Sequence, residues 1–228
     1  MRQLFSFVFL LIVPTLHAQQ NLSVHNSSNE KNNEIDWLVN PVSEKAMVYK
    51  SADNNDIILS NGLLKRTFRI QPNLVCTDFK NMSNGQQLLR AIKPEAEITI
   101  DGNSYNIGGL YGQIENGYIR PEWVNKFVAH DSDFHFLSYE VNDLKPFLDR
   151  KLNIWPMKQQ HPTGKDIAFN FSSSLATLDS IFVTVHYELH DGIPLIVKWV
   201  SVKNNSTHVI TVGKLVNEQL ALVEEESA

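Results

Sequence analysis

The residues best suited to chemistry form a histidine–glutamate–histidine alternation in the last third of the chain. In the run 183–190, His186, Glu188 and His190 occupy every second position, so in a β-strand they share one face. Two imidazoles flanking a carboxylate are suited to binding a metal ion or moving a proton. The solvent-facing side of a half-buried antiparallel strand shows the same alternation. A metal site usually needs a further converging ligand and none stands out, so we expect no metal and no cofactor.

A second group of residues is suited to binding sugars. Between residues 108 and 126 the chain carries four glycines among several aromatic residues, which is typical of a long structured loop on a β-scaffold. Aromatic rings stack on the apolar faces of pyranose rings, and their polar edges can hydrogen-bond. The residues that we expect to bind carbohydrate are Tyr111, Tyr118, Arg120, Trp123 and Trp155. The alternative is that these aromatic side chains close the end of the β-structure or contact another domain.

The single cysteine is not a candidate nucleophile. Cys76 lies beside Val75 and near Phe79, with no histidine or basic residue next to it to lower its pKa. We therefore expect a small buried apolar residue. One cysteine also rules out a disulfide within the chain.

Composition and patterning divide the chain into three parts. Residues 1–18 combine Arg2, an apolar stretch and a small residue at Ala18, which predicts a signal peptide and a secreted or periplasmic protein. Residues 19–34 are rich in Asn, Ser and Gln and predict a flexible leader. Residues 35–228 contain the apolar residues of a folded domain.

The charge of the chain argues against nucleic acid as a partner. Removing residues 1–18 takes away Arg2 and no acidic residue, so the net charge falls from −5 to −6. Nucleic-acid binding needs a positive face. After residue 18 no run reaches the ~18 apolar residues of a spanning helix, so no membrane span is expected in the mature chain.

Alternating apolar residues and turn dipeptides predict an all-β fold. Asn61-Gly62 separates two strand-like runs, Asp101-Gly102 separates two more, and Asp191-Gly192 opens a series of runs that reads as an antiparallel meander to residue 223. Sustained helical periodicity is lacking. We expect an antiparallel β-supersandwich of two packed sheets that is incomplete at its C-terminus.

Three stretches carry a family resemblance. They are the runs 57–68, 108–113 and 187–195, which read IILSNGLLKRTF, GGLYGQ and YELHDGIPL. In order and spacing they resemble the N-terminal β-supersandwich of secreted bacterial α-galactosidase-like glycoside hydrolases, a fold related to galactose mutarotases. In that family the sandwich precedes a catalytic barrel, and no catalytic residue of the family has a counterpart here.

The resemblance implies a non-catalytic role for this chain. It would support or complete a sugar site, with a galactose-containing glycan as partner and a catalytic domain downstream. Two alternatives remain open, a free-standing carbohydrate-binding module and a mutarotase-like aldose epimerase. For the epimerase, His186 and Glu218 are the nominal acid and base.

Overall fold

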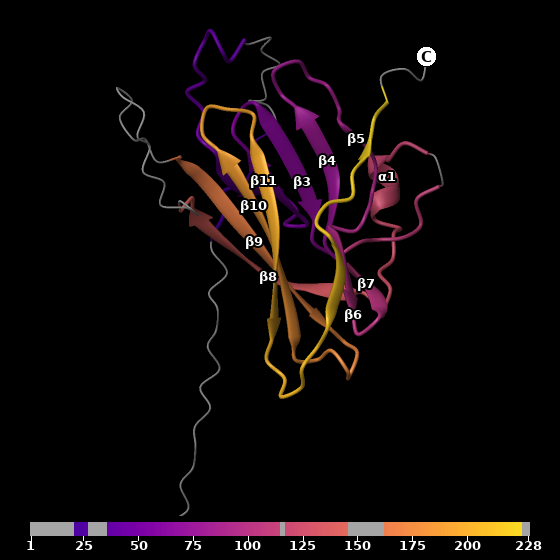
Figure 1. Ribbon diagram of the computed structural model, residues 1–228. Helices are drawn as coiled ribbons and strands as arrows, with labels where there is room; N and C mark the ends of the chain where they lie inside the picture. Colours follow the sequence, from indigo (N-terminus) through magenta and orange to yellow (C-terminus); the bar gives the residue numbers. More distant parts are fainter. Residues whose placement is uncertain (1–20, 27–35, 115–116, 146–161, 225–228) are drawn as a thin grey trace, which may run out of the picture.

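The prediction of an all-β sandwich is confirmed. The computed structural model describes residues 21–26, 36–114, 117–145 and 162–224. Within these ranges the chain forms a four-stranded sheet, a seven-stranded sheet and a two-stranded sheet, together with one short helix (Figure 1). No helix of this described part is long and apolar enough to cross a membrane.

The four-stranded sheet has the order β1-β2-β3-β4, and every neighbouring pair is antiparallel. Its strands are β1 (Met47–Lys50), β2 (Asp56–Ser60), β3 (Leu64–Arg69) and β4 (Val75–Asn81). In β3 the side chains alternate between buried and half-buried along the whole strand, so one face of this sheet lies on the core.

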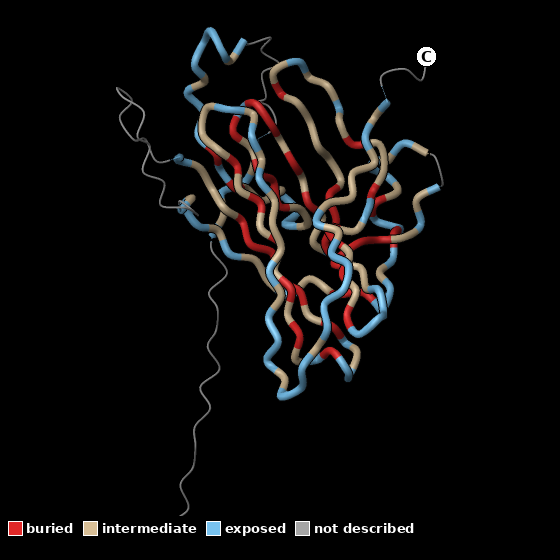
Figure 2. The backbone as a smooth tube through the Cα atoms, viewed as in Figure 1, coloured by how far each residue is buried: buried red, intermediate tan, exposed pale blue. Residues whose placement is uncertain are grey.

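The seven-stranded sheet has the order β11-β10-β9-β8-β7-β6-β12. Its strands are β6 (Ala96–Ile100), β7 (Asn103–Ile107), β8 (Phe134–Asp143), β9 (Gly164–Ser173), β10 (Ile181–His190), β11 (Ile196–Asn204) and β12 (Val212–Val216). The two-stranded sheet pairs β5 (Leu89–Ala91) with β13 (Ala221–Leu222), and the helix is α1 (Pro121–Val124). Figure 2 shows buried residues along the strands of both larger sheets.

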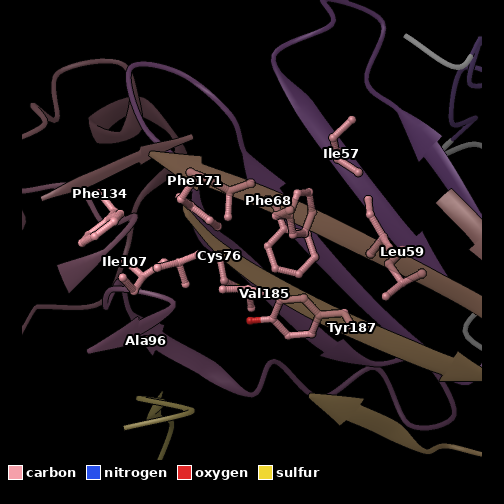
Figure 3. Close-up of a cluster of buried hydrophobic side chains, with 14 of the residues drawn as sticks. Ile57, Leu59, Phe68, Cys76, Ala96, Ile107, Phe134, Phe171, Val185 and Tyr187 are labelled. Atoms are coloured by element: carbon pink, nitrogen blue, oxygen red, sulfur yellow. The ribbon is translucent and has the colours of Figure 1, made fainter. Parts of the chain in front are cut away.

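Aromatic side chains join the two larger sheets at the centre of the core (Figure 3). The ring of Phe68 on β3 lies 4.9 Å from that of Phe169 on β9 and 4.9 Å from that of Tyr187 on β10. All three side chains are fully buried. Large aromatic rings bury much apolar surface and dominate the energetics of such a core.

The meander predicted for the C-terminal third is only partly correct. The hairpin β10–β11 forms around residues 191–192 as expected. The next strand, β12, does not continue beside β11 but pairs with β6 at the other edge of the sheet. The sheet nevertheless curls so that its two edge strands approach each other. Just after β12, the Nδ2 amide of Asn217 donates to the carbonyl of Lys198 on β11 at 2.9 Å.

Two of the predicted turns, at Asp101-Gly102 and at Asn61-Gly62, differ from one another in backbone conformation. At 101–102 both Asp101 (φ 48°) and Gly102 (φ 83°) are left-handed, as a type I′ hairpin turn requires. At 61–62 only Gly62 is left-handed, so this turn is not type I′. Asn61 is instead fully buried, and its side-chain amide donates to the carbonyls of His190 and Ile193, at 2.7 and 2.8 Å, in the turn between β10 and β11.

Part of the segment expected as a leader lies beside the sandwich. The backbone N–H of His25 donates to the carbonyl of Lys50, and the N–H of Lys50 donates to the carbonyl of Ser23. Leu22 packs against the core.

Candidate functional site

The described parts of the loop after β7, residues 108–114 and 117–130, are folded against the domain. The apolar side chains of this loop form a second small core with Val75 and Ile92, built from Leu110, Val124 and Phe127 with Ile119 and Trp123 at its margin. Paired backbone hydrogen bonds join Tyr111 to Val128 at 2.8 and 3.0 Å. These contacts fix the loop, so any side chains that it exposes are held in place before a ligand arrives.

Gly108 fixes the point where this loop leaves β7. Its φ is +66°, and a Cβ built on it would lie 2.5 Å from the carbonyl oxygen of Leu74. The neighbouring N–H of Gly109 donates to that same oxygen at 2.7 Å. Glycine is therefore required here both for the left-handed conformation and for the close approach of two backbones.

Three of the sequence-predicted residues lie close together on this loop, and we call Tyr118, Arg120 and Trp123 the aromatic loop site. Tyr118 is 52% exposed. The guanidinium carbon of Arg120 lies 5.3 Å from the centre of the Trp123 ring, which is a cation–π geometry. Trp123 is half-buried against the small core. The loop thus exposes the aromatic ring of Tyr118 and the guanidinium of Arg120, which lies over the ring of Trp123.

Tyr111 has a different environment. Its ring is stacked on that of His130, with centroids 3.7 Å apart and planes at 4°. Its hydroxyl donates to Asp133 at 2.7 Å and accepts from Asn106 at 2.8 Å. Burial and the bond to Asp133 raise the pKa of Tyr111 to about 12. One ring face and the hydroxyl of Tyr111 are therefore engaged within the domain, while Trp155 lies outside the described residues.

The histidine–glutamate–histidine face lies on the outer side of β10, as the alternation predicts. His186 contacts Asp166 at 3.2 Å through Nδ1, and its ring stacks on Trp199 at 3.5 Å. Trp199 in turn donates to Glu188 at 3.2 Å. Among the described residues no group of three histidine, cysteine or carboxylate side chains is arranged to hold a metal ion.

His186 and Glu218 are not brought together. His186 is on the outer side of β10, whereas the next residue, Tyr187, points into the core and is fully buried. Glu218 bonds Lys198, whose Nζ lies 4.9 Å from the Tyr187 ring centre. The nominal acid and base of an epimerase therefore lie on opposite faces of this strand.

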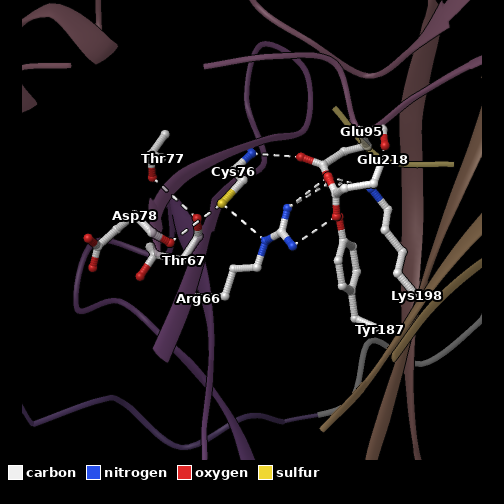
Figure 4. A network of polar contacts seen from close by, with 9 residues as sticks. All are labelled: Arg66, Thr67, Cys76, Thr77, Asp78, Glu95, Tyr187, Lys198 and Glu218. Carbon is white, nitrogen blue, oxygen red and sulfur yellow. Dashed lines mark hydrogen bonds and ion pairs between the residues drawn. The ribbon is translucent and has the colours of Figure 1, made fainter. Parts of the chain in front are cut away.

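A buried charge cluster, which the sequence analysis does not predict, lies between the sheets where β11 and β12 approach (Figure 4). Its members are Arg66, Glu95, Tyr187, Lys198 and Glu218, with Cys76 at one end. The Arg66 guanidinium holds the Glu218 carboxylate through two bonds of 3.1 and 3.3 Å. Lys198 Nζ reaches the same carboxylate at 3.1 Å and Glu95 at 3.7 Å.

Glu95 is the innermost member of this cluster. It is 1% exposed, and its carboxylate accepts the Cys76 N–H at 2.7 Å and the hydroxyl of Tyr187. Its backbone carbonyl accepts from Lys198 Nζ. Two cations thus balance two carboxylates, which is what a buried ionic group needs in order to be tolerated.

The pKa shifts in the cluster have clear causes. Burial alone would raise the pKa of Glu218, but the charges of Arg66 and Lys198 outweigh it, so this pKa is lowered. Burial lowers the pKa of Lys198 more than the two carboxylates raise it. The contacts of its Nζ with three oxygens are those of a protonated donor, and we describe Lys198 as charged. Burial raises the pKa of Cys76 to about 11, so the thiol stays protonated.

No protein-family model, curated protein or solved structure matches this chain.

Proposed function

We propose that this chain is a non-catalytic, carbohydrate-binding domain of a secreted α-galactosidase-like glycoside hydrolase, and that its ligand is a galactose-containing glycan. The observation that carries the proposal is the aromatic loop site, where the exposed Tyr118 ring lies two residues before an arginine placed over Trp123. A pyranose ring can stack on the exposed aromatic face, and the guanidinium can donate hydrogen bonds to sugar oxygens.

The rigidity of the loop supports this role. Ile119 and Trp123 pack on the small apolar core, so the backbone beside Tyr118 and Arg120 is anchored to the domain. A site that is already ordered loses little conformational entropy on binding. Weak individual sugar contacts can then produce measurable affinity.

The buried charge cluster supports a role without catalysis. Hydrolysis of a glycosidic bond uses two carboxyl groups on either side of the bond. Glu95 is 1% exposed and Glu218 is held by Arg66 and Lys198. Neither carboxylate is free to protonate a leaving group or attack a sugar, so we assign the cluster to the stability of the fold.

The proposal is tested by titrating the 228-residue chain with neutral galactose-containing oligosaccharides in a calorimeter. Binding should be detected, and Tyr118→Ala should weaken it about tenfold, a loss of ~1.4 kcal/mol. The matched control is Leu137→Ala, which removes a similarly exposed apolar side chain (59%) from β8. The absence of binding to every one of these oligosaccharides, or equal losses in both variants, would overturn the proposal.

A further inference from the structure

Four turns within the described residues have an asparagine or aspartate before a glycine, and in three of them that side chain holds a distant part of the chain. Asn61 donates to two carbonyls of the turn between β10 and β11. Asp101 accepts the backbone N–H of Thr211 at 2.8 Å, and Asp191 accepts that of Ala46 at 2.8 Å. Each of these three side chains is therefore fixed by a contact across the fold.

The fourth turn, Asn84-Gly85, follows β4 and has no such anchor among the described residues. The Asn84 side chain is exposed. Its Oδ1 accepts the backbone N–H of Gln86 at 3.0 Å, and its Nδ2 lies 3.5 Å from the side-chain oxygen of the same residue. Both contacts stay within the turn, so no described residue outside the turn restrains the Asn84 side chain.

The side-chain amide of Asn84 and the backbone nitrogen of Gly85 are suited to react with each other. Gly85 has no Cβ, so attack by its nitrogen is less hindered than attack by that of any other residue type. The Gly85 N–H has no hydrogen-bond partner in the described part of the chain. The Gln86 N–H at Oδ1 stabilises the negative charge that develops on this oxygen when the side-chain carbon Cγ is attacked.

The same dipeptide at Asn61-Gly62 is protected by the fold. Asn61 is fully buried, and its Oδ1 accepts the backbone N–H groups of Leu63 and Leu64 at 3.0 and 2.9 Å. Loss of its Nδ2 would leave two carbonyl acceptors without their donor. Hydrolysis would also need water at a side chain that is fully buried. The fold thus gives two identical dipeptides opposite reactivity.

We propose that Asn84 is a site of spontaneous deamidation, with water as the only co-reactant. The Gly85 nitrogen forms a bond to Cγ of Asn84, the bond from Cγ to Nδ2 breaks, and the proton of the Gly85 nitrogen leaves with Nδ2 as ammonia. The product is a succinimide ring. Water then opens this ring, either between Cγ and the nitrogen, which gives aspartate, or between the backbone carbonyl carbon and the nitrogen, which gives isoaspartate. One water enters, one ammonia leaves, and no atom is oxidised or reduced.

Both products change the turn that follows β4. Each carries a carboxylate where the neutral amide stood, so the net charge of the chain falls by one unit. Isoaspartate also lengthens the backbone of the turn, because the chain then runs through the former side chain. The backbone bond that closes the turn, from the Asn81 N–H to the Gln86 carbonyl at 2.9 Å, lies outside residues 84 and 85. The inference is independent of the proposed function, which concerns another loop.

The test incubates the 228-residue chain at mildly alkaline pH and follows each Asn-Gly peptide by mass spectrometry, with isoaspartate methyltransferase labelling to identify isoaspartate. In the folded chain Asn84 should be converted at least about tenfold faster than Asn61, because a protected site reacts only in the fraction of molecules that is locally open. In guanidinium chloride the two sites should react at similar rates, because the dipeptides are then equally exposed.

Two variants complete the test. Asn84→Gln lengthens the side chain, so that attack would have to form a larger ring, and its turn peptide should stay unmodified. The matched control is Asn103→Gln, which changes another exposed asparagine and should leave the conversion of Asn84 at the wild-type rate. Equal rates at Asn61 and Asn84 in the folded chain would overturn the proposal. An unmodified Asn84 in the folded chain, after the unfolded chain has reacted, would overturn it as well.

Discussion

Replacing Arg66 by methionine tests the energetic role of the buried charge cluster. Methionine keeps most of the apolar packing of the arginine stem but removes its charge and its donors. The native cluster holds two cations and two carboxylates. The variant leaves Glu95 and Glu218 with Lys198 alone, a net negative charge between the sheets.

The expected cost follows from what each carboxylate retains. Breaking a buried ion pair by removing one partner costs about 3–5 kcal/mol. Glu218 keeps Lys198 at 3.1 Å and is 28% exposed, so water can replace part of the lost interaction. Glu95 keeps the Cys76 N–H and the Tyr187 hydroxyl. We therefore expect the lower end, about 3 kcal/mol, or a fall in Tm of roughly 6–12 °C for a domain of this size.

Urea denaturation followed by tryptophan fluorescence measures this change in the free energy of unfolding. The double variant Arg66→Met/Glu218→Gln restores neutrality and should be more stable than the single variant by about 1 kcal/mol or more. Lys165→Met serves as control, because its partner Asp143 is 84% exposed, and it should cost less than ~1 kcal/mol. A cost for Arg66→Met no larger than that of the control, or a double variant no better than the single one, would refute the reasoning.

Two further predictions concern acid stability and backbone conformation. Because the pKa of Glu218 is lowered, the stability that this carboxylate contributes is fully present above the ordinary pKa of 4.5 and is lost as the pH falls through the lowered pKa. Urea midpoints measured from pH 7 downward should therefore fall less steeply for Glu218→Gln than for the wild type. Parallel curves for the two proteins would contradict this prediction. Gly102→Ala meets no atom within 4 Å and should cost only the left-handed penalty of about 1 kcal/mol. Gly108→Ala also meets the carbonyl of Leu74 and should cost at least ~2 kcal/mol more, so equal thermal stabilities of the two alanine variants would show that the close approach is unimportant.

The local features of the fold were predictable from the sequence because they depend on neighbouring residues. The hairpin at Asp101-Gly102 and the alternation around His186 are examples, and both occur as expected. The pairing of β12 with β6 was not predictable in this way. It joins Val212 to Ile100, and nothing in a local apolar pattern specifies which distant strand edge will be its partner.

Two members of the charge cluster are recognisable in the sequence, because they are charged residues on the apolar side of an alternating run. Arg66 lies between Leu64 and Phe68 on the apolar side of an alternating run, and Lys198 lies similarly between Ile196 and Val200. A charged residue on the buried side of a strand requires a partner of opposite sign. The sequence does not reveal that Glu95 and Glu218 are those partners, because the curl of the seven-stranded sheet brings them there.

The pairing of β6 with β12 has a consequence for the order in which the chain is made. β6 is complete at residue 100, but its partner strand emerges only at residues 212–216. At synthesis rates of roughly 5–20 residues per second, about 6–22 s pass between the completion of β6 and the start of its partner strand. During that interval another nascent chain can pair with β6 instead. The late synthesis of β12 therefore leaves this edge of β6 open to association between newly made copies.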